Sequence, residues 1–246
     1  MLIIKPYIFK QFPEIIFGFS TKVGDGEKEP YFFNMSYSVG DNKEIVDDNR
    51  KKFFGKLGLD EKMASYQKQV HGDVIRKVES FGNCGESDAL ITTQKNLGLV
   101  ISSADCPAIF IYDPVQEIIA AVHSGWRGTE KKILKKTIKQ LKENYLSDPS
   151  NLVCYIGPSI SQKNYEVGEE VASKFDKSFV RVSKNKFYLD LTGANLQMLI
   201  DSGVNKNNIQ TSRLCTFEYE NLLHSYRKYG LESGRALGVI AMKEHL

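Results

Sequence analysis

The chain has 246 residues, of which 41% are hydrophobic and 26% are charged, and its formal net charge is +3. This mix is typical of a globular protein with a sizeable core, and it excludes a disordered chain. Because the lysines and arginines are scattered and nearly balanced by acidic residues, we expect no nucleic acid partner. No apolar run approaches the ~18 residues of a membrane span.

The N-terminal segment and the cysteines predict where the protein works. The segment Met1-Leu2-Ile3-Ile4-Lys5-Pro6 begins short apolar runs that are broken by charged residues and prolines, which a secretory signal would not contain. We therefore expect a cytoplasmic protein without a membrane anchor. The four cysteines form no Cys-x-x-Cys pair, so free thiols are expected.

Hydrophobic patterning predicts many short strands and a few helices. The expected strands cover residues 2–9, 14–20, 66–75 (interrupted by a turn at His71), 88–92, 97–101, 109–112, 118–122, 152–156, 187–191 and 236–242. The expected helices run from an N-cap at Asp41 to Gly58, from a cap at Thr129 to about residue 144, and over 169–175 and 194–202. A loop is expected over 21–30.

Several of these strands follow one another without a helix between them. That order favours an α+β layered fold with mixed sheets over a doubly wound parallel sheet. No internal repeat or long linker interrupts the chain, so a single domain is expected over residues 1–246. No segment marks an interface, and a monomer is the default expectation.

Two turns at strand ends carry the candidate chemistry. Ser102-Ser103-Ala104-Asp105-Cys106-Pro107 presents a thiol, and Ala121-Val122-His123-Ser124-Gly125-Trp126-Arg127-Gly128-Thr129 presents an imidazole. With His71, they make a His₂Cys set that suits Zn²⁺ and leaves a fourth position for water or substrate. Zinc would lower the pKa of that water towards ~7. The wide spacing matches no compact zinc ribbon, so the spacing alone does not prove a metal site.

Other interpretations of the same residues stay open. Cys106 could be a nucleophile, with His123 as its base and Asp105 or another carboxylate as the orienting group. It could also be a small buried residue that only packs. Arg127, at a predicted helix start, suits an anion such as phosphate. Arg50, on the helix that ends at Gly58, is as compatible with a surface role as with a functional one.

Six motifs occur together in one order. They are Gln69-Val70-His71-Gly72, Ser87-Asp88-Ala89-Leu90-Ile91-Thr92, Ala104-Asp105-Cys106-Pro107, residues 121–129, Ile156-Gly157-Pro158-Ser159-Ile160 with Tyr165-Glu166-Val167-Gly168, and Ser225-Tyr226-Arg227 with Gly234-Arg235. With this pattern the chain resembles the bacterial polyphenol-oxidase or laccase-domain family, also called peptidoglycan-editing factors. Members of that family include zinc-dependent purine nucleoside phosphorylases.

The resemblance implies a layered α/β/β/α sandwich, with two packed sheets flanked by helices, and His71, Cys106 and His123 as metal ligands. It also implies phosphorolysis of adenosine, inosine, guanosine and methylthioadenosine, and deamination of adenosine. Older assignments gave the family a copper-dependent phenol oxidation. Two segments depart from the family pattern: the loop Lys22-Val23-Gly24-Asp25-Gly26 lacks the usual arginine, and His224 stands where the family has phenylalanine.

The favoured hypothesis is therefore a zinc enzyme that acts on purine nucleosides and phosphate. Cys106, His123 and Asp105 are the expected catalytic residues, with Asp105 as a proton carrier or as the group that orients a ligand imidazole. Phosphate would be held by Arg50 and Arg127, with Arg227 behind them.

Three alternatives are weaker. A copper-dependent polyphenol oxidase is disfavoured because four histidines are too few for a multicopper cluster. A cysteine hydrolase or editing factor would act on peptidoglycan precursors without a metal. A binding protein would use zinc only to brace the fold, with His224 as a fourth ligand.

Overall fold

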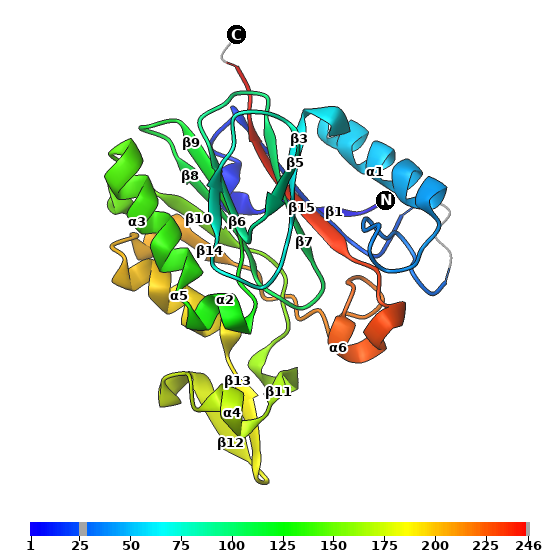
Figure 1. Ribbon diagram of the computed structural model, residues 1–246, viewed down its shortest axis with the longest axis vertical. Coiled ribbons are helices and arrows are strands. Elements are labelled where there is room, and N and C mark those ends of the chain that lie inside the picture. Colours follow the sequence, from blue (N-terminus) through cyan, green and yellow to red (C-terminus); the bar gives the residue numbers. More distant parts are fainter. Residues whose placement is uncertain (25–28, 245–246) are drawn as a thin grey trace.

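Two six-stranded sheets pack face to face in the part of the chain that the computed structural model describes, residues 1–24 and 29–244 (Figure 1). The first sheet has the order β1 (Ile3–Ile4), β2 (Ile15–Ser20), β15 (Ala236–Met242), β7 (Gly98–Ser103), β3 (Ala64–Lys68) and β5 (Gly82–Glu86). The second has the order β14 (Ile209–Thr211), β10 (Val153–Ile156), β8 (Ala108–Asp113), β9 (Ile118–His123), β6 (Ala89–Thr92) and β4 (Ile75–Lys77). Both sheets mix parallel and antiparallel pairs.

Strand β8 contains a continuous apolar run because both of its faces are buried. Phe110 and Tyr112 belong to the core between the two sheets, whereas Ile109 and Ile111 belong to the core on the opposite face of the second sheet. Successive side chains of a strand point to opposite faces, so a strand covered on both faces must be apolar at every position. Phe17 of β2 closes the inner layer with its ring centroid 4.9 Å from that of Phe110.

Helices cover the outer face of each sheet (Figure 1). Helix α1 (Lys43–Leu57) packs Phe53 and Phe54 against the first sheet. Helices α3 (Ile133–Tyr145) and α5 (Leu191–Asp201) pack against the second. The expected layered α+β fold with mixed sheets is confirmed.

A small third sheet extends from one end of these layers (Figure 1). It has the order β11 (Glu166–Val167), β13 (Lys186–Leu189) and β12 (Val180–Ser183), and α4 (Glu169–Ala172) packs beside it. The remaining helices are α2 (Trp126–Glu130) and α6 (Tyr226–Tyr229). Short 3₁₀ helices lie at Tyr7–Phe9, Glu61–Met63, Pro149–Asn151, Gln162–Asn164, Lys177–Phe179, Lys206–Asn208 and Gly230–Glu232.

Three local predictions are wrong or displaced. The expected strand over 2–9 is β1 followed by a 3₁₀ turn, because Pro6 cannot continue a strand ladder. Helix α1 is capped by Asn42, whose side chain accepts from the Glu44 amide, rather than by Asp41. The single helix expected after Thr129 is two helices, since Lys132 between them has a left-handed φ of 61°.

The described part of the chain bears on two further predictions. The cysteines there, Cys84, Cys106, Cys154 and Cys215, are all free thiols, as expected. None of its helices is long and apolar enough to cross a membrane. Residues 25–28 of the expected loop over 21–30, and the histidine at 245, lie outside the described residues.

Candidate metal centre

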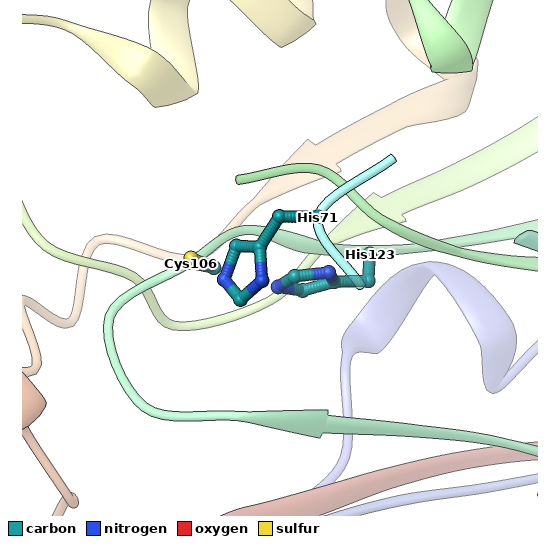
Figure 2. A group of neighbouring side chains, drawn as sticks. All are labelled: His71, Cys106 and His123. Atoms are coloured by element: carbon teal, nitrogen blue, oxygen red, sulfur yellow. The ribbon is translucent and has the colours of Figure 1, made fainter. Parts of the chain in front are cut away.

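His71, Cys106 and His123 meet at one end of the two sheets (Figure 2). One ligand atom from each lies within 4.8 Å of the others. The two imidazole rings have their centroids 4.8 Å apart and are nearly perpendicular, at 85°. This arrangement allows all three side chains to face one metal ion, so the residues that the sequence analysis selected are brought together.

Strand register explains how distant segments converge there. His123 ends β9 and pairs with Ala108 at the start of β8, which places Cys106 beside it. On the other side of β9, strand β6 begins opposite Val122, so the residue before β6, Asp88, lies next to His123. The His123 amide donates to the Asp88 carbonyl over 2.8 Å.

Asp88 is a site residue that the sequence analysis missed. Its fully buried carboxylate lies 2.8 Å from His123 Nδ1 and accepts hydrogen bonds from the amides of Val70 (3.2 Å), His71 (3.0 Å) and Gly72 (2.6 Å). One carboxylate therefore fixes both the turn that carries His71, whose φ is 57°, and the ring of His123. A proton held on Nδ1 leaves Nε2 of His123 free to bind a metal. The signal in the sequence was a carboxylate directly before a buried strand.

The electrostatics of the His71–Cys106–His123 group favour a charged pair. Burial would raise the pKa of the Cys106 thiol, but hydrogen bonds from His123 and His71 outweigh it and lower that pKa. Burial would lower the pKa of His123, whereas its bonds to Asp88 and to the Cys106 sulfur raise it. The thiolate that a metal ligand requires is therefore stabilised before any ion arrives.

Gly125 packs directly against the side chains of the metal group. A Cβ atom at this position would lie 2.9 Å from His71 Cδ2 and 3.1 Å from Cys106 Sγ. Its φ of −64° is open to any residue, so glycine is required here for space and not for conformation.

The Asp105 carboxylate contacts other partners than the ligand imidazoles. It accepts from Thr216 Oγ1 over 2.5 Å and from the Arg227 amide over 2.6 Å, on a backbone with a φ of 86°. The orienting role that we expected for Asp105 falls to Asp88 at His123. A role for Asp105 as proton carrier stays a prediction.

The side chain of Arg50 contacts residues around α1. Its Nε donates to the Met35 carbonyl over 2.7 Å, and its Nη1 lies 3.3 Å from Glu61 Oε1. The rings of Tyr37 and Tyr66 flank its guanidinium at 4.2 and 4.9 Å. These contacts give Arg50 a structural function, and its expected contact with phosphate stays a prediction.

The two other expected arginines are exposed beside the metal group. Arg127 stacks over the ring of its neighbour Trp126 at 4.3 Å. Arg227 donates from Nη1 to the Glu166 carbonyl over 2.6 Å and lies over the Tyr165 ring at 5.1 Å. The pKa of Tyr165 is raised, first by burial and then by the nearby Cys106 thiolate, while both arginines lower it. Tyr165, which the sequence analysis did not select, thus lies among these groups.

His224 is not part of this ligand group. It is buried, with Nε2 3.4 Å from the carbonyl of Phe33, and burial lowers its pKa to about 3. The described residues place three ligands in the group, so a zinc site closed by His224 is not what the geometry shows.

Known proteins are similar to this chain in both sequence and fold. The chain is 32% identical over 249 residues to the purine nucleoside phosphorylase YlmD of Bacillus subtilis, which covers 94% of this chain and 90% of the relative. It is 31% identical over 228 residues to a purine nucleoside phosphorylase of Deinococcus radiodurans, which covers 91% and 88%. The crystal structure of YlmD from Geobacillus stearothermophilus superposes with a TM-score of 0.91 at 28% identity, covering 96% of this chain and 94% of that one.

The family comparison agrees with the motifs. A family model described as multi-copper polyphenol oxidoreductase laccase matches residues 16–243. The motifs around His71, Cys106 and His123 lie inside this range. The chain therefore belongs to the polyphenol oxidoreductase laccase family, as its motifs predicted.

Proposed function

We propose that the protein is a zinc-dependent enzyme that cleaves purine nucleosides by phosphorolysis and deaminates adenosine. The observation that carries the proposal is the His₂Cys group with Asp88 behind it. The relatives named purine nucleoside phosphorylase support a nucleoside and phosphate as the substrates. Adenosine, inosine, guanosine and methylthioadenosine are the nucleosides to test.

The donor set fits zinc. One thiolate and two imidazoles are zinc ligands, and three protein ligands are typical of a catalytic site with an open position. The family description names copper, and the same three ligands could hold one copper ion. A multicopper cluster needs more histidines than the four in the chain, so zinc is favoured.

The residues of the chain would divide the work as follows. His71, Cys106 and His123 would hold the ion, and Asp88 would keep the His123 tautomer. When bound, Zn²⁺ supplies a Lewis acid at the reacting end of the substrate. In phosphorolysis, a phosphate oxygen attacks C1′ of the ribose while the C1′–N9 bond breaks and the purine leaves with its electron pair. In deamination, water adds at C6 and ammonia leaves, with Asp105 as the candidate proton carrier.

Chromatography of zinc-loaded protein incubated with adenosine tests the proposal. Adenine that forms only when phosphate is present would establish phosphorolysis, and inosine in either condition would establish deamination. Cys106→Ala should abolish both products because it removes a ligand. The proposal fails if wild-type protein converts no adenosine under any metal loading.

One observation favours a second candidate, a cysteine hydrolase acting on peptidoglycan precursors. Cys106, His123 and Asp88 lie in the order nucleophile, base and orienting carboxylate, and the pKa of the thiol is lowered. Removal of the metal separates the two candidates. A Cys–His dyad keeps its activity after chelation, whereas the zinc enzyme loses it and regains it when Zn²⁺ is restored.

A further inference from the structure

Arg235 lies beside the metal group, although the sequence analysis, which placed it in a motif with Gly234, gave it no role at the site. Strands β15 and β7 are antiparallel neighbours (Figure 1), and Ala236 pairs with Ser103. The residue before β15 therefore lies across from the residues that follow β7. Those residues lead directly to Cys106, so the pairing brings Arg235 to the turn that carries the thiolate.

The side chain of Arg235 is held in place on one side. Its Nη1 donates to the carbonyls of Ser233 (2.6 Å) and Gly234 (3.0 Å), and its guanidinium lies 5.2 Å from the centroid of the Tyr226 ring. The backbone amide is also fixed, because it donates to Asn34 Oδ1 over 2.9 Å. These contacts order the guanidinium before any ligand binds.

The other side of the guanidinium has no partner among residues 1–24 and 29–244. Within the described residues, Arg235 Nε and Nη2 make no hydrogen bond, and Arg235 forms no ion pair with a carboxylate. The oxygens of the neighbouring Asp105 are engaged by Thr216 and by the Arg227 amide. Neither Nε nor Nη2 is among the buried side-chain atoms without a partner in the described part of the chain, so both donors reach solvent and are open to an anionic ligand.

The charge of Arg235 interacts with that of the metal group. Burial lowers the pKa of Arg235, whereas the charges of Asp105, Tyr226 and Cys106 raise it. Among the arginines expected to hold phosphate, Arg50 has its Nε and Nη1 engaged, and Arg127 and Arg227 are exposed. Compared with those three arginines, only Arg235 combines partial burial, fixed placement and free donors.

We propose that Arg235 binds the phosphate substrate, with Nε and Nη2 as paired donors to two phosphate oxygens beside the His71–Cys106–His123 group. This inference rests on the proposed function for the identity of the anion. A planar guanidinium matches two oxygens of a phosphate, which a lysine cannot do.

Direct binding of inorganic phosphate to the zinc-loaded protein tests the inference without any turnover. In calorimetric titrations, Arg235→Gln should weaken phosphate binding by about 10- to 100-fold, the usual effect of losing hydrogen bonds to a charged group. Arg235→Lys, which keeps the charge without the planar fork, should show a smaller loss. Acetate at equal ionic strength should neither bind comparably nor displace phosphate.

Arg181→Gln is the matched control. Arg181 also stacks on a tyrosine, Tyr188, at 4.3 Å, but it lies on β12 of the small sheet. The Arg181→Gln substitution removes the same charge and should leave phosphate affinity unchanged. Circular dichroism and zinc content would show that each variant is folded and loaded, and if Arg235→Gln does not fold, Arg235→Lys decides.

The outcomes separate this inference from the proposed function. Failure of wild-type protein to bind phosphate, equal affinity in the Arg235 variants, or equal binding of acetate would each overturn the inference. Loss of phosphate binding in the Arg235 variants, in a protein that converts no nucleoside, would support this phosphate site and reject the proposed function.

Discussion

Asp88 connects the two histidines of the metal group through one buried carboxylate. Oδ1 lies against His123 Nδ1 and the His71 amide, while Oδ2 accepts from Val70 and Gly72. An asparagine cannot replace it, because its NH₂ group would face either an N–H donor of the backbone or the Nδ1–H of His123. Asp88→Asn should therefore weaken Zn²⁺ binding by about 10- to 100-fold, as measured by competition with a chelator.

Asp105→Asn is the control for that experiment. Asp105 is also buried and acidic, but its carboxylate accepts from Thr216 and Arg227 and not from a ligand histidine. Its Zn²⁺ affinity should remain close to that of the wild type. Equal losses in the two variants would show that Asp88 acts only through general stability.

These two aspartates also show what sequence could supply at the scale of residues. Residue type and position at strand ends selected His71, Cys106 and His123, because thiols and imidazoles on turns are uncommon and informative. Asp88 directly precedes a buried strand and Asp105 lies on the turn between β7 and β8, but neither position shows which carboxylate contacts His123. The contact with His123 depends on the pairing of β6 with β9, which a single sequence does not give.

At the scale of elements, the junction between β9 and α2 controls the space under the metal group. Ser124 and Thr129 hold this junction through buried hydrogen bonds to Asn195 of α5. Thr129 also donates to the Gly125 carbonyl, from its amide over 2.9 Å and from Oγ1 over 3.0 Å, and these bonds restrain Gly125 against the ligands. Gly125→Ala should lower the free energy of unfolding by about 1–3 kcal/mol through overpacking and should also weaken Zn²⁺ binding.

Gly55→Ala provides the comparison for Gly125→Ala. Gly55 lies within α1, where an added Cβ would meet no atom within 4 Å. This variant should raise the free energy of unfolding by about 0.5–1 kcal/mol and leave Zn²⁺ affinity unchanged. Chemical denaturation and the same chelator competition would measure both. A Gly125→Ala protein that binds zinc like the wild type would contradict the space argument.

The elements themselves were predictable where their burial is complete. Strands β7, β8 and β9 were expected almost within their observed bounds, since both of their faces are covered. Strand β5, with the sequence Gly-Asn-Cys-Gly-Glu, was missed because it is a half-exposed edge strand with no apolar pattern. The break at Lys132 was missed because a lysine gives no sign of a left-handed backbone.

At the scale of the whole molecule, the layered fold brings distant parts of the chain to one end of the sheets. The ligands come from the β3–β4 and β7–β8 connections and from the end of β9, and Arg235 directly precedes the last strand, β15. The motifs predicted this family and its layers through resemblance. They did not predict that β15 lies between β2 and β7, so the approach of Arg235 to Cys106 required the structure.

The stability of the whole fold should also depend on His224, which lies within the C-terminal segment and against the Phe33 carbonyl. Burial lowers its pKa to about 3 from an ordinary value of 6.5. Between about pH 6.5 and pH 3, the unfolded chain therefore binds a proton at His224 that the folded protein does not bind. The free energy of unfolding falls as the pH decreases through this range. Linkage predicts that His224 alone removes about 1 kcal/mol between about pH 7.5 and pH 5.5.

His224→Gln tests this dependence, because glutamine cannot take up the proton. The free energy of unfolding, measured by denaturation at several pH values, should decline less steeply with acid in the variant than in the wild type. His123, whose pKa is shifted in the opposite direction, is present in both proteins, so its contribution cancels in the difference. Parallel curves for the two proteins would mean that His224 is already protonated, or exposed, in the native state.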